Sequence, residues 1–285
     1  MPTAAVAPRF GRVAMIGKPS SAGIAASLSE LRAFLERRGC KVLGEGEAHS
    51  ADLAVVIGGD GTMLAAARDL VRHRVPLVGI NQGRVGFMTD IGQKDMLGGV
   101  GSILDGQGSV EERSLLDAEI LRDGRSLLRT LALNEAVLGK GAQGRLIEFS
   151  LSLDGEFVYT LRADGMIVCT PTGSTAYALS AQGPILHPAV PALALVPLNP
   201  HTLSARPVSV GDRSAIEIRL VRALDAQAYF DGVAHAELAE GDRLMLKRSA
   251  DVLRFVHPPG YRYFATLREK LRWSEAPLRK GRGTE

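Results

Sequence analysis

Cysteine, aromatic residues and long apolar runs are all scarce in this 285-residue chain. Its two cysteines, Cys40 and Cys169, lie far apart in the sequence. Two such residues form neither a disulfide framework nor a four-ligand metal site, which favours a reducing cytoplasm over secretion. Aromatic residues make up only 5% of the chain, so aliphatic side chains must form most of the core.

No apolar stretch approaches the roughly 18 residues that a membrane helix needs. The most apolar stretch, residues 192–196, is bordered by prolines, and the apolar residues 13–16 are too few for a signal peptide. The net charge of +3 is too small to indicate a nucleic-acid or membrane partner, whereas a pI of about 9.0 suits small anionic ligands. We therefore expect a cytoplasmic protein that binds neither nucleic acid nor membrane.

Strand and helix patterns alternate over the first hundred residues. The predicted buried strands are residues 12–17, 40–43, 53–57 and 76–80. Apolar residues at helical spacing from Ile24 to Leu35, and a second helical pattern over residues 62–71, lie between strands. This order predicts a parallel sheet with crossover helices, and hence an α/β domain over residues 1–108.

The period changes to two from about Val110. Apolar and polar residues alternate over residues 147–153 and again over 157–161, on either side of an Asp-Gly pair. Alternation with Asp-Gly turns is typical of antiparallel sheets, so residues 109–258 are predicted as an all-β domain, sandwich-like or built as two packed sheets. Residues 162–165 are interpreted as a further hairpin turn of this kind.

A third segment, residues 259–285, begins after a Pro-Pro-Gly sequence. Phe264, Leu267 and Leu271 recur at helical spacing there. The segment is therefore predicted as a final helix that packs back on the domains, followed by a basic tail.

The most informative motif is Gly-Gly-Asp-Gly-Thr at residues 58–62, which follows a buried strand and opens a helix. Ligands of open α/β sheets bind at that edge, and helix N–H groups there attract phosphate. Asp60 could orient a hydroxyl nucleophile, accept its proton or help to hold magnesium. The alternative is a tight turn in which Asp60 caps the helix through Thr62 or Met63. The motif matches neither the P-loop nor the G-x-G-x-x-G pattern, so another kind of phosphate site is expected.

Three further segments offer ligand-binding groups. Glycine-rich residues 79–87 follow the next strand, and Phe87 either packs on a base or belongs to the core. Asn134 and Glu135 place an amide beside a carboxylate, which suits the two hydroxyls of a ribose. Residues 171–180 carry five hydroxyl groups directly after a predicted strand, which is typical of a pocket wall. The six histidines show no metal-ligand spacing, so no metal site built by the protein alone is expected.

Together these segments resemble the NAD kinase family, in its bacterial type. Residues 58–62 alone are shared with lipid kinases and, in related form, with phosphofructokinases. The segments that look like NAD kinase specifically are residues 79–89, 134–135, 162–165, 170–184, 201–207 and 261–273. The resemblance covers almost the whole chain in the family's order. It implies an α/β amino-terminal domain, an all-β carboxyl-terminal domain, and phosphorylation by ATP of the adenosine ribose 2′-hydroxyl of NAD⁺, giving NADP⁺ and ADP.

The resemblance also implies roles for particular residues. Asp60 would accept the proton of the ribose hydroxyl, with Gly61 beside it, and Phe87 would face the adenine. Asn134 and Glu135 would bind NAD ribose hydroxyls or the diphosphate-bearing end. The remaining residues expected at the dinucleotide are Arg145, Arg162, Asp164, Thr175, Ala176, Tyr177, Ala178, Leu179 and Ser180. Mg²⁺, or another divalent cation, would accompany ATP, and the protein would be a homodimer or homotetramer.

One residue departs from the family pattern. Val233 follows Asp231-Gly232 where the family commonly has Gln, which puts one polar contact to a nucleotide or a neighbouring subunit in doubt. Two other functions stay open: a lipid or sugar kinase that shares residues 58–62, and a non-catalytic NAD(P)-binding regulator. The hydroxyl-rich segment favours a dinucleotide over a lipid, and Asp60 favours an enzyme over a regulator. Polyphosphate as donor and NADH as acceptor are left open.

Overall fold

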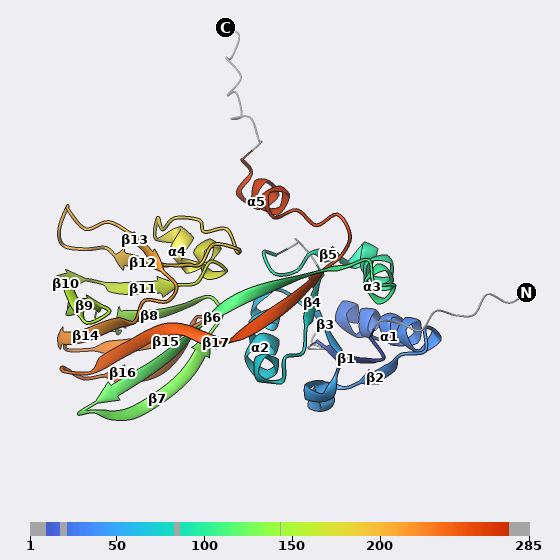
Figure 1. Cartoon of the computed structure of the whole chain (residues 1–285), viewed down its shortest axis with the longest axis horizontal. Coiled ribbons are helices and arrows are strands. Elements are labelled where there is room, and N and C mark those ends of the chain that lie inside the picture. Colours follow the sequence, from blue (N-terminus) through green and yellow to red (C-terminus); the bar gives the residue numbers. More distant parts are fainter. Residues whose placement is uncertain (1–9, 18–21, 83–85, 143, 274–285) are drawn as a thin grey trace, which may run out of the picture.

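The computed structural model describes residues 10–17, 22–82, 86–142 and 144–273. Its amino-terminal half is the predicted α/β unit (Figure 1). The elements are β1 (Arg12–Ile16), α1 (Ala22–Arg37), β2 (Lys41–Leu43), η1 (Glu45–Ser50), β3 (Leu53–Ile57), α2 (Asp60–Leu70), η2 (Val71–His73), β4 (Leu77–Asn81), β5 (Ile91–Gly92), η3 (Gln93–Asp95) and α3 (Met96–Leu104), where η denotes a 3-10 helix. The strands lie in the order β2-β1-β3-β4 with β5 beside β4, and every pair is parallel, as predicted.

Helices cover both faces of this parallel sheet, because its strands carry apolar side chains on both sides. All five residues of β3 are buried. Leu35 of α1 and Val100 of α3 share one core layer with Val55, whereas Met63 of α2 shares another layer with Val56. The continuous apolar run over β3 is therefore explained by burial on both faces.

The remaining strands form the predicted antiparallel half. Its elements are β6 (Ser109–Arg122), β7 (Arg125–Ala132), β8 (Glu135–Lys140), β9 (Ile147–Leu153), β10 (Glu156–Ala163), β11 (Gly165–Cys169), η4 (Gly173–Thr175), α4 (Tyr177–Ser180), β12 (Ala192–Leu198), β13 (Val208–Gly211), β14 (Ile216–Arg222), β15 (Ala226–Phe230), β16 (Val233–Leu238) and β17 (Arg243–His257). One sheet has the order β13-β12-β11-β8-β15-β16 and is antiparallel throughout. Its core is shared with the second sheet and contains Phe149 and Phe230. The prediction of two packed sheets is confirmed.

The second sheet is continuous with the parallel sheet, and β17 joins them. This strand pairs antiparallel with β14 and β6, and its Phe255 pairs parallel with Leu77 of β4. The result is one 11-stranded sheet that runs through both halves of the molecule, with β6 and β17 crossing between them (Figure 1). The division at residues 108/109 and 258/259 stays a prediction.

The interpretation of residues 162–165 as a hairpin turn is wrong. Arg162 and Ala163 end β10, which pairs with β9, whereas Gly165 begins β11, which pairs with β8 and β12 in the other sheet. Asp164 is therefore the single residue at which the chain passes from one sheet to the other. Gly165 permits this crossing, because a Cβ there would lie 2.3 Å from the carbonyl oxygen of Leu138.

The final helix, α5 (Tyr263–Leu271), packs against the antiparallel half. Leu267 is buried, the Tyr263 hydroxyl donates to the carbonyl of Leu186 over 3.4 Å, and the Tyr263 ring contacts His187 edge-on at 4.8 Å. Residues 274–285, including the predicted basic tail, lie outside the described residues. Of the helices in the described ranges, none combines the length and apolarity that a membrane span requires.

Candidate active site

Asp60 is the first residue of α2, directly after the edge of the parallel sheet where β3 ends. Gly59 is the N-cap residue and provides no side chain to cap the helix. The first N–H groups of α2 and the positive end of its dipole therefore lie beside the Asp60 carboxylate. This arrangement places an acceptor for protons next to groups that attract phosphate.

The carboxylate of Asp60 is held by the second glycine-rich segment. Its two oxygens accept hydrogen bonds from the backbone N–H groups of Phe87, over 3.2 Å, and Met88, over 3.1 Å. The alternative in which Asp60 caps its own helix through Thr62 or Met63 is wrong, because those N–H groups donate to the carbonyl of Gly59. These bonds place the two glycine-rich segments side by side.

Gly86 is required for this contact. A Cβ at position 86 would lie 2.1 Å from Oδ1 of Asp60 and 2.8 Å from the Thr89 hydroxyl. Thr89 in turn accepts hydrogen bonds from the Gly86 N–H and from the Asn81 side-chain amide. Residues 86–90, which we call the Asp60 loop, are therefore held beside the Asp60 carboxylate.

A second set of acidic residues lies where β8 begins. The carboxylate of Asp231 accepts backbone N–H bonds from three consecutive residues, Leu133, Asn134 and Glu135. Asp231 is in the left-handed region, with φ of 50°, at the turn between β15 and β16. Burial nevertheless raises the pKa of Asp231 above its ordinary value.

Glu135 is a buried carboxyl group with unused hydrogen-bonding capacity. Its residue is 5% exposed, and burial, with the neighbouring charge of Asp231, raises its pKa to about 7. The Tyr177 N–H donates to the carboxylate, but Oε2 is buried without a partner among the described residues. An unpaired buried acceptor is costly, which indicates that a ligand donor completes this site.

Glu135 lines a cavity of about 430 Å³. Across it, Lys140 makes an ion pair of 2.7 Å with Asp164, and the Asn199 amide donates to the same carboxylate over 2.9 Å. Tyr177 lines this cavity and a neighbouring one of about 550 Å³, which also includes Ser180 and Arg206. Two adjoining cavities that share Tyr177 and carry charged side chains offer room for an extended ligand.

The hydroxyl-rich segment forms η4 and α4 rather than an open loop. Ser174 is fully buried, and its hydroxyl donates to the carbonyl of Pro171 and accepts from the Leu186 N–H. Thr170 donates to the carbonyl of Leu133, directly before Asn134. Gly173 packs so closely there that a Cβ would lie 2.0 Å from the carbonyl oxygen of Asn134. Several of the hydroxyls therefore shape the pocket wall instead of facing a ligand.

The other predicted site residues are distributed unevenly. Ala178 is fully buried in a core cluster, whereas Thr175, Ala176 and Leu179 are half-buried. Phe87 is also half-buried. Arg145 and Arg162 are exposed and line neither cavity. Their roles, like those of Gly61, Asn134 and Asp164, stay predictions.

Packing brings the two acidic regions together. Leu133, one residue before Asn134, shares a core cluster with Met63 of α2 and with Met88 of the Asp60 loop. Arg68 of α2 lies close enough to Asp231 to lower the pKa of that carboxyl, although burial acts more strongly in the opposite direction. The helix that begins at Asp60 therefore packs against Leu133, two residues before Glu135.

Sequence reasoning missed Asp231, Lys140 and Asn199 at this site. In the sequence, Asp231 is part of an Asp-Gly pair that indicates only a turn. Asp154 is part of the same kind of pair and lines neither of the two cavities described above. Lys140 and Asn199 stand in no motif. No group of three or more His, Cys, Asp or Glu side chains is arranged to hold a metal ion in the part of the chain that the structure describes.

Comparison with known proteins supports one family. The models of the ATP-NAD kinase N-terminal and C-terminal domains match residues 40–106 and 133–258. An NAD kinase from Aromatoleum aromaticum is 54% identical over 95% of this chain and 96% of its own length. An NAD kinase from an Azoarcus species is 53% identical over 94% of this chain and 98% of its own.

Two solved structures share the fold. A yeast NADH kinase complexed with NADH has a TM-score of 0.86 at 23% identity, covering 96% of this chain and 91% of its own. An NAD kinase from Archaeoglobus fulgidus in complex with ATP has a TM-score of 0.77 at 27% identity, covering 92% of this chain and 98% of its own. With both family domains present and with more than half of its residues shared with bacterial members over nearly its full length, the chain belongs to the NAD kinase family.

Proposed function

We propose that the protein transfers the γ-phosphoryl group of ATP to the 2′-hydroxyl of the adenosine ribose of NAD⁺, giving NADP⁺ and ADP. The observation that carries the proposal is the Asp60 carboxylate, held by two N–H groups at the start of α2, in a chain similar to bacterial NAD kinases throughout. The alternatives of a lipid or sugar kinase and of a non-catalytic regulator are not favoured by these comparisons.

Asp60 acts on the acceptor hydroxyl. A ribose hydroxyl is far too weak an acid for a carboxylate to deprotonate in advance. Asp60 therefore orients the hydroxyl through a hydrogen bond and takes its proton late, as the new bond to phosphorus forms. The N–H bonds from Phe87 and Met88 hold the carboxylate in one orientation for this step.

We assign the cavity beside Glu135 to the dinucleotide. The unpaired Oε2 of Glu135 is suited to accept a hydrogen bond from a ribose hydroxyl, and Asn134 precedes it. Tyr177 and Asp164 line the same cavity, which supports the predicted dinucleotide contacts of both.

Mg²⁺ is proposed to enter with ATP. The described residues offer no group of three His, Cys, Asp or Glu side chains that could hold the ion alone. Its remaining ligands would therefore come from the nucleotide. When bound, the metal neutralises phosphate charge. We further propose a homodimer or homotetramer in the cytoplasm. The two cysteines are free and buried, as a reducing compartment permits.

The test of the function is formation of NADP⁺ from NAD⁺ and Mg·ATP, followed with an NADP-specific dehydrogenase. We expect turnover with Mg·ATP and none in excess chelator, with activity restored by added Mg²⁺. A folded protein that binds NAD⁺ but forms no NADP⁺ would support the regulator, and one that does not bind NAD⁺ would support the lipid or sugar kinase. Full activity in chelator would contradict the role given to the metal.

Gly86→Ala is expected to lower kcat by about 100-fold, because its Cβ would displace the Asp60 carboxylate by more than an ångström. The dissociation constant for NAD⁺ should change much less, since Glu135 is untouched. Gly44→Ala is the matched control: a Cβ there meets nothing within 4 Å, and its φ of −80° suits alanine. Equal kcat values for the two variants would show that the loop does not position Asp60.

A further inference from the structure

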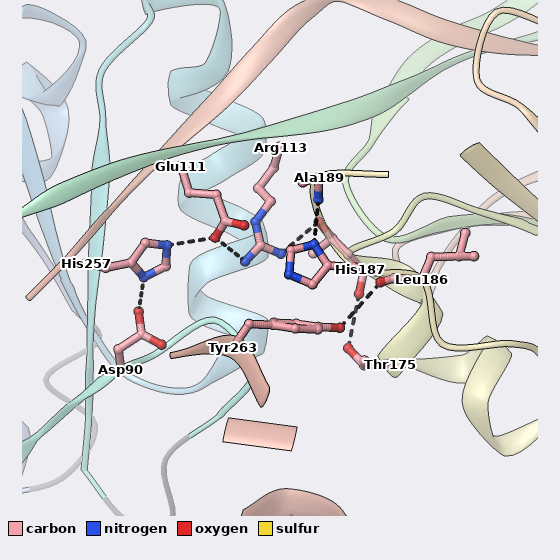
Figure 2. A network of polar contacts seen from close by, with 10 residues as sticks. Asp90, Glu111, Arg113, Thr175, Leu186, His187, Ala189, His257 and Tyr263 are labelled. Atoms are coloured by element: carbon pink, nitrogen blue, oxygen red, sulfur yellow. Dashed lines mark hydrogen bonds and ion pairs between the residues drawn. The ribbon is translucent and has the colours of Figure 1, made fainter. Parts of the chain in front are cut away.

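His257, the last residue of β17, is buried between two carboxylates. It is 3% exposed; its Nδ1 lies 2.5 Å from Oδ2 of Asp90, and its Nε2 lies 2.9 Å from Oε2 of Glu111 (Figure 2). A carboxylate oxygen only accepts hydrogen bonds, so each ring nitrogen must donate one. With both carboxyl groups ionised, this geometry corresponds to the doubly protonated imidazolium form of His257.

One of these carboxylates belongs to the Asp60 loop. Asp90 lies two residues after Met88, whose N–H group donates to Asp60. Thr89, between them, is fully buried and anchors the Gly86 N–H. The position of this loop is therefore fixed on one side by Asp60 and on the other by His257.

The second carboxylate, that of Glu111, is connected to the hydroxyl-rich segment through Arg113. Oε2 of Glu111 also accepts a hydrogen bond from Nη2 of Arg113 over 2.8 Å, and Nη1 of Arg113 donates to the Thr172 hydroxyl over 3.3 Å. The carbonyl of Thr172 accepts from the Thr175 hydroxyl, at the start of the segment that lines the proposed dinucleotide cavity. Figure 2 shows His257 between Asp90 and Glu111, with Arg113 bonded in turn to Glu111.

The charges in this series balance only with a proton on His257. The groups that face its ring are Asp90, Glu111 with its partner Arg113, and Tyr261, whose ring stacks on the imidazole at 3.8 Å. Burial by itself lowers the pKa of His257, but the hydrogen bonds and charges of the two carboxylates outweigh it and raise the pKa above the ordinary value. Loss of the proton would leave two carboxylates facing one guanidinium in a buried site.

We propose that protonated His257 is a positioning residue that ties the Asp60 loop to the hydroxyl-rich segment at the dinucleotide cavity. The role rests on the proposed function. The relative position of the two loops affects catalysis only if a phosphoryl group is transferred between a ligand at one loop and a ligand at the other. In this arrangement, removing the proton at alkaline pH separates the two loops and lowers kcat. His257 acts through Asp90 and Arg113 and does not itself touch the reacting atoms.

The variant His257→Gln tests directly whether His257 holds the two loops in position. We expect kcat for NADP⁺ formation to fall by about tenfold near neutral pH, with a smaller change in KM for NAD⁺, because the loops lose their alignment and the cavity keeps its walls. We expect kcat of the wild type to decline at alkaline pH as His257 loses its proton, and this decline should be absent from the variant. His73→Gln, which alters an exposed histidine on η2, should match the wild type in kcat and in pH profile.

Asp90→Asn provides a second variant that retains a hydrogen-bond acceptor for Nδ1 but removes one charge. The alkaline decline of kcat should move to lower pH by about one unit or more, since an opposite charge at this distance shifts a pKa by that amount. The His257 ring signals in an NMR titration should move by the same amount. A purely structural histidine would change thermal stability without moving the pH profile.

The outcomes separate the two proposals. A wild type that forms no NADP⁺ overturns the proposed function, and with it the positioning role. An active wild type whose His257→Gln variant keeps its kcat and its alkaline decline overturns the positioning role alone. Likewise, an Asp90→Asn variant with an unchanged pH profile would show that the state of His257 is not transmitted to the reaction.

Discussion

Asp60→Asn should lower kcat for NADP⁺ formation by roughly 10²–10⁴, the range that general-base assistance contributes. The amide has nearly the same shape as the carboxylate, but it cannot take the proton of the ribose hydroxyl. It also provides only one oxygen for the N–H groups of Phe87 and Met88, both of which donate to Asp60. The chemical step should therefore be affected far more than the binding of NAD⁺.

The measurement for Asp60 is kcat by the coupled assay, with the dissociation constant for NAD⁺ and the melting temperature taken on the same samples. Asp69→Asn is the matched control, because Asp69 is an exposed carboxyl group on the same helix. A folded Asp60→Asn variant with turnover within a few-fold of Asp69→Asn would remove the proton-accepting role from Asp60. The transfer would then proceed by positioning alone.

Glu135→Gln should increase stability at alkaline pH while weakening the binding of NAD⁺. The pKa of Glu135 in the folded chain is about 7, above the ordinary value of 4.5. The folded chain therefore holds this proton more tightly than the unfolded chain. The stabilisation is complete below about pH 4.5 and is lost as pH rises through 7, at a cost of about 3 kcal/mol. Glutamine stays neutral and avoids this loss.

Urea unfolding of the ligand-free protein at pH 5 and pH 8 tests the stability part. We expect the two proteins to differ little at pH 5, whereas the variant should be more stable at pH 8. At pH 8 its dissociation constant for NAD⁺ should rise by about 10- to 100-fold, since the charged acceptor of a hydrogen bond becomes a neutral amide. Glu156→Gln, at an exposed position, controls for the substitution itself. An identical pH dependence of unfolding for wild type and Glu135→Gln would contradict the raised pKa.

The α/β half could be predicted because its strands are buried on both faces. A run such as β3, with all five residues buried, has to be apolar throughout, and the helices between such runs show their own period. The turns at Asp123, Asp154 and Asp231 were likewise visible as Asp-Gly pairs, and all three residues have positive φ. Local chemistry determines each of these elements, so a local pattern reveals it.

The pattern fails where position depends on distant partners. Asp164 stands in an Asp-Gly pair like the others, but the sheet to which the following strand belongs is decided by pairing with β8 and β12. The contacts of His257 with Asp90 and Glu111 join residues that are 167 and 146 positions apart. Nothing near any of the three in sequence signals the other two, and only the pairing of β17 with β6 and β4 brings them together.

The same pairing sets the order in which the molecule can be completed during synthesis. Strand β4 is made early in the chain, yet one of its neighbours, β17, extends to His257. A nascent chain on the ribosome therefore carries its amino-terminal sheet with β4 unpaired at Leu77, beyond the reach of β5, until nearly all of the protein has been made. Contacts of such sequence separation form slowly, and an open edge can pair with other chains. The strand that joins the two halves of the enzyme thus also makes the amino-terminal half dependent on residues Arg243–His257, which are made when about nine tenths of the chain is complete.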